Sequence, residues 1–323
     1  MAELRIAVLD DYQQVAHGCA DWSSIPGAET VFFSDHLTDE DALVECLAEF
    51  DVLVVMRERT PLSRALLSRL PRIRLIVTTA TRNASIDVPA ASDLGIVVCG
   101  TRHAQPATAE LTWGLIISLL RRIPAEDRLL REGGWQANVG GDLSGSTLGV
   151  LGLGRLGSRV ARVGLAFEMD VIAWSENLTD QRAAAAGAVR VGKDELFSRA
   201  DVLTIHTLLS GRTRGLVGAS ELALMKPTGV IVNTSRGPII DEAALLDALR
   251  EGRIAGAALD VFDQEPLAPD HELRRSRNTV LTPHLGYVTR NSYATYYQDA
   301  VEDIRAFLDG AALRMITGSQ VRP

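Results

Sequence analysis

The segment VLGLGRLGSRVA, residues 150–161, is the clearest signal of fold in this chain. It begins with an apolar run typical of a buried strand and ends with the apolar spacing of an amphipathic helix. Between these parts, Gly152, Gly154 and Gly157 have the spacing Gly-x-Gly-x-x-Gly. In such a turn the first glycine permits the bend, the second lets a pyrophosphate approach the backbone, and the third lets the helix pack closely on the strand. The segment therefore predicts a Rossmann-type dinucleotide-binding domain.

The start of the predicted helix and the end of the next strand carry the cofactor contacts that we expect. Arg155 and Leu156 stand where unpaired backbone N–H groups and the helix dipole attract an anion. After the strand DVIAW (170–174), Rossmann domains usually place an acidic residue on the adenosine ribose of NAD, but here Ser175 and Glu176 follow. Serine lacks the charge that would repel the 2′-phosphate of NADP, whereas Glu176 can bind the ribose or repel that phosphate. The cofactor is therefore NAD or NADP, with NAD slightly favoured.

Short apolar runs alternate with helical patterns on both sides of this segment, which is typical of parallel sheets covered by helices on both faces. In the first hundred residues the runs are RIAVL (5–9), TVFF (30–33), DVLVV (51–55), RLIVT (74–78) and GIVVC (95–99), with helical stretches at 39–50 and 63–70. The second series is TLGVLGL, DVIAW, DVLTIH, GVIVN and GAALDV, and a last helical pattern covers 292–309. We predict an α/β fold in which residues 104–290 form the dinucleotide-binding domain. Residues 1–103 with 291–323 would form a smaller, flavodoxin-like α/β substrate domain.

Composition limits the classes of function. With 323 residues, 46% hydrophobic and 23% charged, the chain is long enough for two globular domains and too apolar for disorder. A formal net charge of -8 argues against nucleic acid, whose binding needs clustered Lys and Arg. No apolar segment approaches the roughly 20 residues that span a bilayer, and we find no export signal. Three cysteines without a pairing pattern fit a reducing cytoplasm, and no ligand spacing predicts a metal site.

The segment ATAELTWGLIISLLRRI, residues 107–123, predicts one long helix. It is apolar on nearly all sides, so neighbouring structure must bury it. We expect a second copy of the chain to supply part of that cover, and hence a homodimer formed through residues 104–122. Trp113 and Trp135 are expected in the core or in the subunit contact.

Three segments follow in the second half of the chain: VNTSRGPIIDEAALLDAL (232–249), GAALDVFDQEP (256–266) and LTPHLG (281–286). They resemble the signature segments of the D-isomer-specific 2-hydroxyacid dehydrogenase family, and the similarity extends from about residue 50 to about residue 310. The resemblance implies an NAD(P)-dependent oxidoreductase that acts on a D-2-hydroxy acid and its 2-keto acid. It also implies a catalytic trio, which is Arg236 for the substrate, Glu265 to orient the histidine, and His284 as acid and base.

The resemblance assigns further residues to the cofactor. Those at its nicotinamide end are Thr234, Ser235, Asp260 and Gly286. His206 and Thr207 follow a neighbouring strand, although the proline that the family usually has two residues after the histidine is Leu208 here.

Reduction of a 2-keto acid independently requires the residue types of the trio. It needs a cation for the carboxylate and carbonyl, a hydride donor on one face, and a proton donor for the developing alkoxide. Arg236 can supply the cation and His284 the proton. A carboxylate beside an imidazole favours its protonated form, so Glu265 would keep His284 charged for reduction.

Substrate residues are also expected in the first domain. The segment VTTATRNASID (77–87) matches the place where the family has a glycine-rich loop whose backbone N–H groups hold the substrate carboxylate. We assign Thr81, Arg82 and Asn83 to the substrate there. Arg57 and Arg59 follow a strand on the same expected edge, and we assign Arg57 to the substrate as well. Two inward-facing arginines would suit a substrate with more negative charge, or more hydrogen-bond acceptors, than lactate.

Two other functions stay open. A dinucleotide-sensing binding protein, like the transcriptional corepressors of this fold, would share even the catalytic trio, and a turnover assay separates it from an enzyme. A formate-type dehydrogenase of the same fold is disfavoured, because that relative pairs its histidine with a glutamine where this chain has Glu265. The expected partner is a small 2-keto or 2-hydroxy acid.

Overall fold

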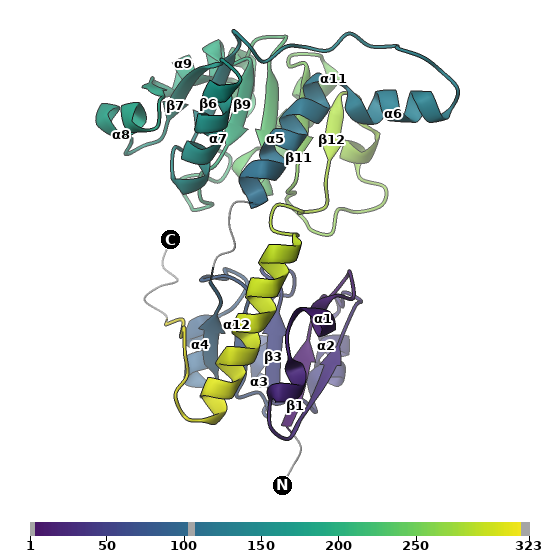
Figure 1. Ribbon diagram of the computed structural model, residues 1–323, viewed down its shortest axis with the longest axis vertical. Helices are drawn as coiled ribbons and strands as arrows, with labels where there is room; N and C mark the ends of the chain where they lie inside the picture. The colour runs from purple at the N-terminus through teal and green to yellow at the C-terminus, as the bar shows by residue number, and fades with distance from the viewer. Residues whose placement is uncertain (1–3, 103–106, 318–323) are drawn as a thin grey trace. The chain divides into compact units, whose positions relative to one another are not determined.

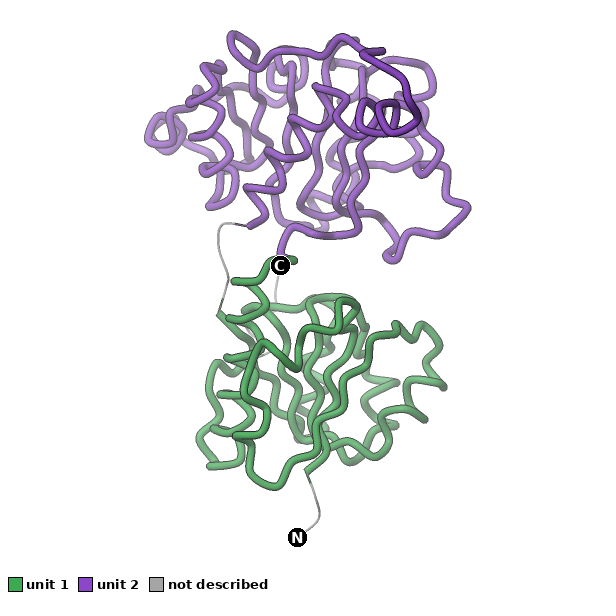
Figure 2. Tube along the Cα trace, turned by 45° about the vertical axis from the view of Figure 1, so that its right-hand side comes forward, with its two compact units in different colours: residues 1–105, 288–323 green, residues 106–287 purple. Residues whose placement is uncertain are grey.

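The structure, a computed structural model, describes residues 4–102 and 107–317. The chain divides into two compact units, which Figure 2 shows in green and purple. Unit 1 consists of Met1–Gln105 and Val288–Pro323, and unit 2 of Pro106–Tyr287. The boundary predicted at 103/104 lies outside the described residues, and the second division falls at 288 rather than at 291.

Unit 1 is built on a parallel sheet of five strands in the order β2-β1-β3-β4-β5. The strands are β1 (Leu4–Val8), β2 (Ala28–Phe32), β3 (Val52–Val55), β4 (Leu75–Thr78) and β5 (Val97–Gly100). The helices are α1 (Ala16–Cys19), α2 (Glu40–Leu47), α3 (Arg64–Ser68), α4 (Val88–Asp93) and α12 (Arg290–Leu308), with a 3-10 turn η1 (Trp22–Ser24). All five predicted strands are confirmed, and the flavodoxin-like order reverses between β1 and β3.

Helices cover both faces of this sheet, because side chains point alternately to its two sides. On one face Ala7, Leu53 and Ile76 pack with residues of α2, α3 and α4. On the other face α12 contacts β4 and α1. Figure 1 shows α12 in front of the sheet and α3 behind it. The last predicted helix, over 292–309, is therefore confirmed as part of the first unit's core.

Unit 2 is built on a parallel sheet of seven strands in the order β12-β11-β10-β9-β6-β7-β8. The strands are β6 (Thr147–Leu151), β7 (Asp170–Trp174), β8 (Val189–Arg190), β9 (Val202–Ile205), β10 (Val230–Asn233), β11 (Gly256–Leu259) and β12 (Thr279–Leu281). This is the Rossmann order with one added strand, and it reverses between β6 and β9. Sequence patterns missed β8 and β12, because two or three residues are too few to show a period.

The helices of unit 2 pack on both faces of its sheet, as Figure 1 shows for α5 and α7 on one side. They are α5 (Ala107–Leu120), α6 (Ile123–Arg131), α7 (Arg155–Ala166), α8 (Asp180–Ala185), α9 (Lys193–Arg199), α10 (Ala219–Leu224) and α11 (Glu242–Arg250), with 3-10 turns η2 (Gly237–Ile239) and η3 (Glu272–Arg275). One core lies under α5, α7 and α8, and the other under α9, α10 and α11.

The helix predicted over 107–123 is two helices. α5 ends at Leu120, and Arg122 has a φ of 55°, in the left-handed region, before α6 begins at Ile123. Buried side chains of α5, such as Trp113, pack within the unit against α7 and the sheet. Its own unit thus supplies most of the cover that we expected from a second copy. Trp135 is 76% exposed, so of its two expected places the core is excluded and the subunit contact stays a prediction.

Among the described residues, no helix combines the length and the apolar character that crossing a membrane requires.

Candidate functional site

The glycine turn between β6 and α7 has two glycines that its own packing requires. Gly152 has a φ of 100°, and a Cβ there would lie 2.8 Å from the backbone of His206. A Cβ on Gly157 would collide with the carbonyl oxygen of Gly152, so the helix could not pack so closely on the strand. Gly154 caps α7, and a Cβ there would have no neighbour within 4 Å among the described residues. Packing therefore does not explain the second glycine.

The expected cofactor residues lie at the carboxyl edge of this sheet. Arg155 is exposed at the first position of α7, and Leu156 beside it is half-buried. Ser175 directly follows β7 and is half-buried, whereas Glu176 is exposed. Because β6 and β7 are paired, the glycine turn and the residues after β7 are neighbours at this edge.

His206 follows β9, which pairs with β6 at the point where the strand order reverses. Its Nε2 lies 2.9 Å from Thr204 Oγ1, while its buried Nδ1 has no hydrogen-bond partner among the described residues. Burial lowers the pKa of His206 to about 4. The ring is therefore neutral over the physiological range, and Thr207 beside it is half-buried.

Arg236 stands at the end of the turn that follows β10. Asn233, 1% exposed, accepts the N–H of Ser235 and donates to the carbonyl of Arg236, so its side chain fixes this turn. Arg236 itself donates from Nη1 to the carbonyl of Ser235 at 2.7 Å. Next to it, a Cβ on Gly237 would collide with the backbone of Phe262. The turns after β10 and β11 are thus held in direct contact.

Glu265 and His284 are brought together by these turns. Glu265 Oε1 accepts the N–H of Phe262 at 2.9 Å, and Glu265 Oε2 lies 2.6 Å from His284 Nδ1. The ring of His284 packs edge-on against Tyr287, with 5.3 Å between the ring centroids. The side chains of His284 and Glu265 are 20% and 33% exposed, so both remain accessible to a substrate.

Asp260 holds the segment that presents His284. It follows β11, is 0% exposed, and its carbonyl accepts the N–H of His284. Its carboxylate accepts the hydroxyl of Thr282 at 2.6 Å and the N–H groups of Leu285 and Gly286 at 2.7 and 2.8 Å. His284 has a φ of 54°, a conformation that a non-glycine residue adopts only where its surroundings impose it. Asp260 is thus a buried support of this turn.

Two other expected cofactor residues use their hydroxyl groups within unit 2. Thr234 Oγ1 lies 2.9 Å from Thr112 Oγ1 in a buried contact. Ser235 donates to the carbonyl of Ile205 at 2.8 Å. The first bond connects the end of β10 to α5, and the second connects it to the end of β9.

In unit 1, the expected substrate residues occupy two turns that are bonded to each other. Arg57 has a φ of 53°, its N–H donates to Thr79 Oγ1 at 2.8 Å, and its carbonyl accepts from Asn83 Nδ2. Asn83, which we assigned to the substrate, is only 3% exposed, and its amide also donates to Thr78. The side chain of Asn83 therefore lies beneath the loop, whereas Thr81 and Arg82 are exposed on it.

Arg59 and the acidic residues Asp10 and Asp11 belong to a separate hydrogen-bond network of unit 1. Arg59 Nη1 donates to the carbonyl of Asp10 at 2.6 Å, and its guanidinium lies 4.2 Å from the ring of Tyr12. Asp11 accepts the backbone N–H groups of Val15 and Ala16 at the start of α1. The guanidinium of Arg59 thus contacts residues of its own unit, whereas the sequence analysis considered that this side chain faces the substrate.

Comparison with known proteins identifies the family. Residues 113–286 match the model described as D-isomer specific 2-hydroxyacid dehydrogenase, NAD binding domain. The glyoxylate reductase of Aeropyrum pernix is 43% identical over 255 residues, which cover 76% of this chain and 76% of that protein. The chain belongs to the D-isomer specific 2-hydroxyacid dehydrogenase family.

Other members of the family extend the match. The D-3-phosphoglycerate dehydrogenase of a Synechocystis strain is 37% identical over 278 residues, and the alignment covers 85% of this chain but 50% of that protein. A phosphoglycerate oxidoreductase from Vibrio cholerae has a crystal structure that matches with a TM-score of 0.92 and 38% identity, over 95% of this chain and 100% of that one. This dehydrogenase is thus an oxidoreductase that transfers a hydride between a nicotinamide dinucleotide and a 2-hydroxy acid/2-keto acid pair. Membership supports that reading over the corepressor-like and formate-type alternatives.

The residues of unit 2 fit the nicotinamide dinucleotide of this dehydrogenase family. The open surface at Gly154 leaves the backbone at the start of α7 accessible, as close approach of a pyrophosphate requires. The resemblance assigns Asp260 to the cofactor, and the sequence does not predict that its carboxylate supports the turn at 282–286. The only signal was an aspartate placed directly after a fully buried strand, with no nearby basic residue in the sequence.

Proposed function

We propose that Arg236, Glu265 and His284 carry out the reaction, with unit 2 as the dinucleotide-binding domain and unit 1 as the substrate domain. The observation that supports this assignment is the distance of 2.6 Å between His284 Nδ1 and Glu265 Oε2. A carboxylate at Nδ1 fixes the tautomer and the orientation of the ring, which leaves Nε2 as the nitrogen that exchanges a proton with substrate.

The mechanism follows from these positions. When bound, the reduced nicotinamide supplies a hydride to the carbonyl carbon of the 2-keto acid. Arg236 binds the carboxylate and polarises the carbonyl oxygen, and His284 donates its Nε2 proton to that oxygen as negative charge develops. Glu265 stabilises the charged imidazole before this transfer. In oxidation, neutral His284 accepts the hydroxyl proton.

A turnover panel tests the assignment. Wild-type protein and His284→Ala are assayed with glyoxylate, hydroxypyruvate, pyruvate and phenylpyruvate, each with NADH and with NADPH. We expect turnover of at least one acid by the wild type and its loss in the variant. Intact dinucleotide binding without turnover of any acid would favour the corepressor-like function instead.

We propose NAD as the preferred cofactor. The exposed Glu176 is the support, because a carboxylate close to the ribose disfavours a 2′-phosphate. Ser175→Asp should raise the ratio of kcat/KM for NADH to that for NADPH, and Asn177→Asp, two residues further on, is the control. An unchanged ratio in Ser175→Asp would mean that other residues recognise this end of the cofactor.

The substrate that we propose is a small 2-keto acid with an acceptor or a charge beyond its carboxylate. Support comes from Arg82, exposed after β4, and from Arg57, half-buried after β3. The relatives include a glyoxylate reductase and a D-3-phosphoglycerate dehydrogenase, which differ in that second group. Arg82→Gln should lower kcat/KM for hydroxypyruvate more than for pyruvate, and equal losses would contradict the proposal.

We also propose a cytoplasmic homodimer. Its contact would include the segment after α5, where four apolar side chains are exposed. They are Ile123, Leu130, Trp135 and Val139, at 47%, 58%, 76% and 99% exposure. A monomeric mass by light scattering at micromolar concentration would count against the dimer.

A further inference from the structure

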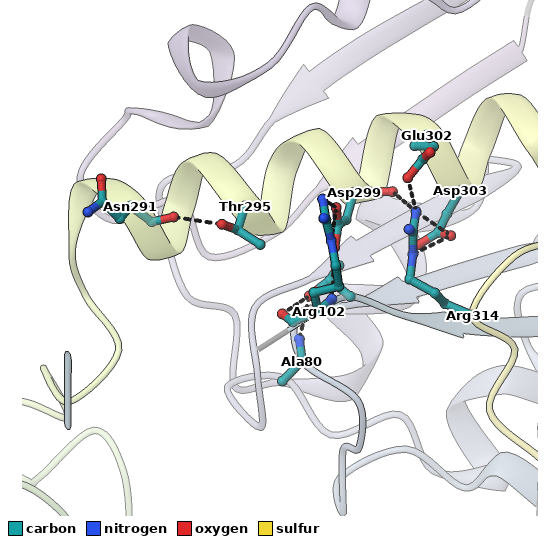
Figure 3. Close-up of polar contacts among 9 residues, drawn as sticks. Ala80, Arg102, Asn291, Thr295, Asp299, Glu302, Asp303 and Arg314 are labelled. Atoms are coloured by element: carbon teal, nitrogen blue, oxygen red, sulfur yellow. Dashed lines mark hydrogen bonds and ion pairs between the residues drawn. The ribbon is translucent and has the colours of Figure 1, made fainter. Parts of the chain in front are cut away.

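The buried Asp299 on α12 is paired with Arg102, at the end of the segment after β5. Asp299 is 1% exposed, and its carboxylate accepts the backbone N–H of Arg102 at 2.8 Å. It also accepts Arg102 Nη2 at 2.6 Å and Nε at 3.1 Å. Figure 3 shows Arg102 between Asp299 and Ala80. A carboxylate bonded by both the main chain and the side chain of one arginine fixes the path of the chain at that arginine.

The residue before Arg102 holds the loop that we assign to the substrate. Thr101 is 0% exposed, its Oγ1 accepts the N–H of Ala80 at 2.7 Å, and its own N–H donates to the carbonyl of Ala80 at 3.0 Å. Gly100 makes this approach possible, since a Cβ there would lie 2.6 Å from the same carbonyl oxygen. Both backbone groups of Ala80 are thus bonded to Thr101.

Ala80 needs this support, because its φ is 81°. A left-handed backbone is unfavourable for a residue with a Cβ and persists only where neighbouring contacts impose it. The exposed Thr81 and Arg82 follow directly, so the turn at Ala80 sets the direction of their backbone N–H groups.

Asp299 is itself held in place and ionised. Its carbonyl accepts Arg314 Nη2 at 3.1 Å, and Arg314 also binds Asp303 one turn further along α12 (Figure 3). Burial opposes ionisation, but the hydrogen bonds of Arg102 prevail and lower the pKa of Asp299. The pair therefore remains charged over the physiological range.

We propose that Asp299 and Arg102 are positioning residues for the substrate carboxylate. They fix Thr101, which imposes the left-handed turn at Ala80 and so orients the backbone of Thr81 and Arg82 toward the substrate. This role rests on the assignment of the 80–83 loop to the substrate that we proposed above. Neither residue contacts the reacting atoms.

Steady-state kinetics of the whole enzyme test the role. Asp299→Asn keeps the shape of the side chain but removes its charge, and Arg102→Gln removes the guanidinium. In each variant we expect KM for the 2-keto acid to rise about tenfold, the effect of one lost charge-assisted hydrogen bond, with kcat and the Kd of the dinucleotide unchanged. Thr101→Val should produce the same rise, and its combination with Asp299→Asn should add little, because both act through Ala80.

Two control variants are needed. One tests whether loss of any ion pair in unit 1 raises KM, and the other tests whether the 80–83 loop binds substrate at all. Arg64→Gln removes an exposed Arg–Asp pair of the same unit, formed with Asp93, and should leave KM unchanged. Arg82→Ala should raise KM if the loop binds substrate. A rise in Arg82→Ala with KM within about twofold of wild type in the Asp299 and Arg102 variants would overturn only the positioning role. No rise in any of them would overturn the substrate assignment and the positioning role with it.

The positioning role can still be tested if Asp299→Asn does not fold. Thr101→Val and Arg102→Gln then carry the test, since the Arg102 side chain is 68% exposed. A lower melting temperature with an unchanged KM, measured well below that temperature, would show that the pair is only structural.

Discussion

Two buried aspartates, one in each unit, lie beneath the loops to which we assign catalysis and substrate binding. Asp260 in unit 2 binds the 282–286 turn through one hydroxyl and two backbone N–H groups. Asp299 in unit 1 binds the backbone and the guanidinium of Arg102. Each thereby supports a residue in the left-handed region, which is His284 in one unit and Ala80 in the other.

The two aspartates differ in the charge of their partners. Burial raises the pKa of Asp260, although the bonds from the turn and the nearby His284 oppose that rise. For Asp299 burial also favours the neutral form, but Arg102 reverses the balance and the pKa falls. The direct donors to Asp260 are all neutral, so its buried carboxylate depends on each of them. The 282–286 turn should therefore tolerate a change at Asp260 less well than the 80–83 loop tolerates a change at Asp299.

The largest effect is expected at the residue that Asp260 presents. Loss of a general acid and base typically slows a reaction by ~10²–10⁴-fold, so His284→Ala should lower kcat by that amount. Glu265→Gln keeps most of the shape and should cause a smaller loss, because the charge that stabilises the imidazolium is gone. Single-turnover kinetics measure the chemical step, and dinucleotide affinity serves as the control. Near-normal turnover in His284→Ala with every 2-keto acid would end the catalytic assignment.

Asp260→Asn is the next test, and it compares the two aspartates directly. An amide places N–H groups opposite the N–H donors of the turn, and a buried unsatisfied donor costs about 1–3 kcal/mol. We expect kcat to fall roughly ten- to a hundredfold, since each 1.4 kcal/mol is a factor of ten. Asp299→Asn should instead change KM. The exposed Asp247→Asn on α11 is the control. If both buried variants changed the same kinetic constant, the division of roles would be wrong.

Local patterns predicted five of the seven strands of unit 2, and the resemblance assigned the trio, because each signal is contained in a short segment. The glycines at 152, 154 and 157 and the segments around Arg236 and His284 need only neighbouring residues to be recognised. The pair of Asp299 and Arg102 could not be predicted, because 197 residues separate them. Nothing in the helical pattern at 292–309 shows which of its acidic residues is buried.

Two other features differ from what the sequence pattern favours, each for its own physical reason. Asn83 has a polar side chain in a loop, which favours a role at the surface, yet its amide donates to the carbonyl of Arg57 and to Thr78 Oγ1 beneath the loop. The helix predicted over 107–123 breaks where Arg122 takes a left-handed conformation, and Pro124, which has no N–H group to continue the hydrogen bonding of α5, lies in the first turn of α6. Tertiary contacts, which a sequence pattern does not contain, decide the position of Asn83, whereas Pro124 is a local signal for the helix break.

A third test concerns His206, which is half-buried but has a buried Nδ1. The folded-state pKa of His206 is lowered to about 4, against about 6.5 in the unfolded chain. Between these values the unfolded chain binds a proton that the folded chain does not, so stability is lost as pH falls through this window. As pH falls through this window, His206→Asn should therefore lose less stability than the wild type does. Urea unfolding of both proteins at several pH values measures the difference in stability, and a constant difference between about pH 6.5 and about pH 4 would contradict the lowered pKa of His206.

The smallest effect is expected at Asp303, one turn beyond Asp299 on α12. Its carboxylate is 0% exposed, Oδ1 accepts Arg314 Nε at 3.0 Å, and Oδ2 has no hydrogen-bond partner among the described residues. Burial raises the pKa of Asp303 to about 7, although Arg314 opposes the rise. Between about pH 4 and about pH 7 the folded chain keeps a proton that the unfolded chain has released, so stability falls as pH rises through this window. Asp303→Asn stays neutral at every pH, and its stability relative to wild type should rise over that window and then level off.

Asp299→Asn is the comparison. The difference in stability between this variant and wild type should stay constant between about pH 4 and about pH 7 and change only below about pH 4, because the pKa of Asp299 is lowered rather than raised. Denaturant titrations of wild type and both variants across this pH range measure the free energies of unfolding. Groups that titrate in all three proteins contribute equally, so they cancel when the wild-type value is subtracted from that of each variant. Parallel curves for Asp303→Asn and Asp299→Asn would mean that neighbouring carboxylates on α12 do not differ in charge state, and that Arg102 does not set Asp299 apart.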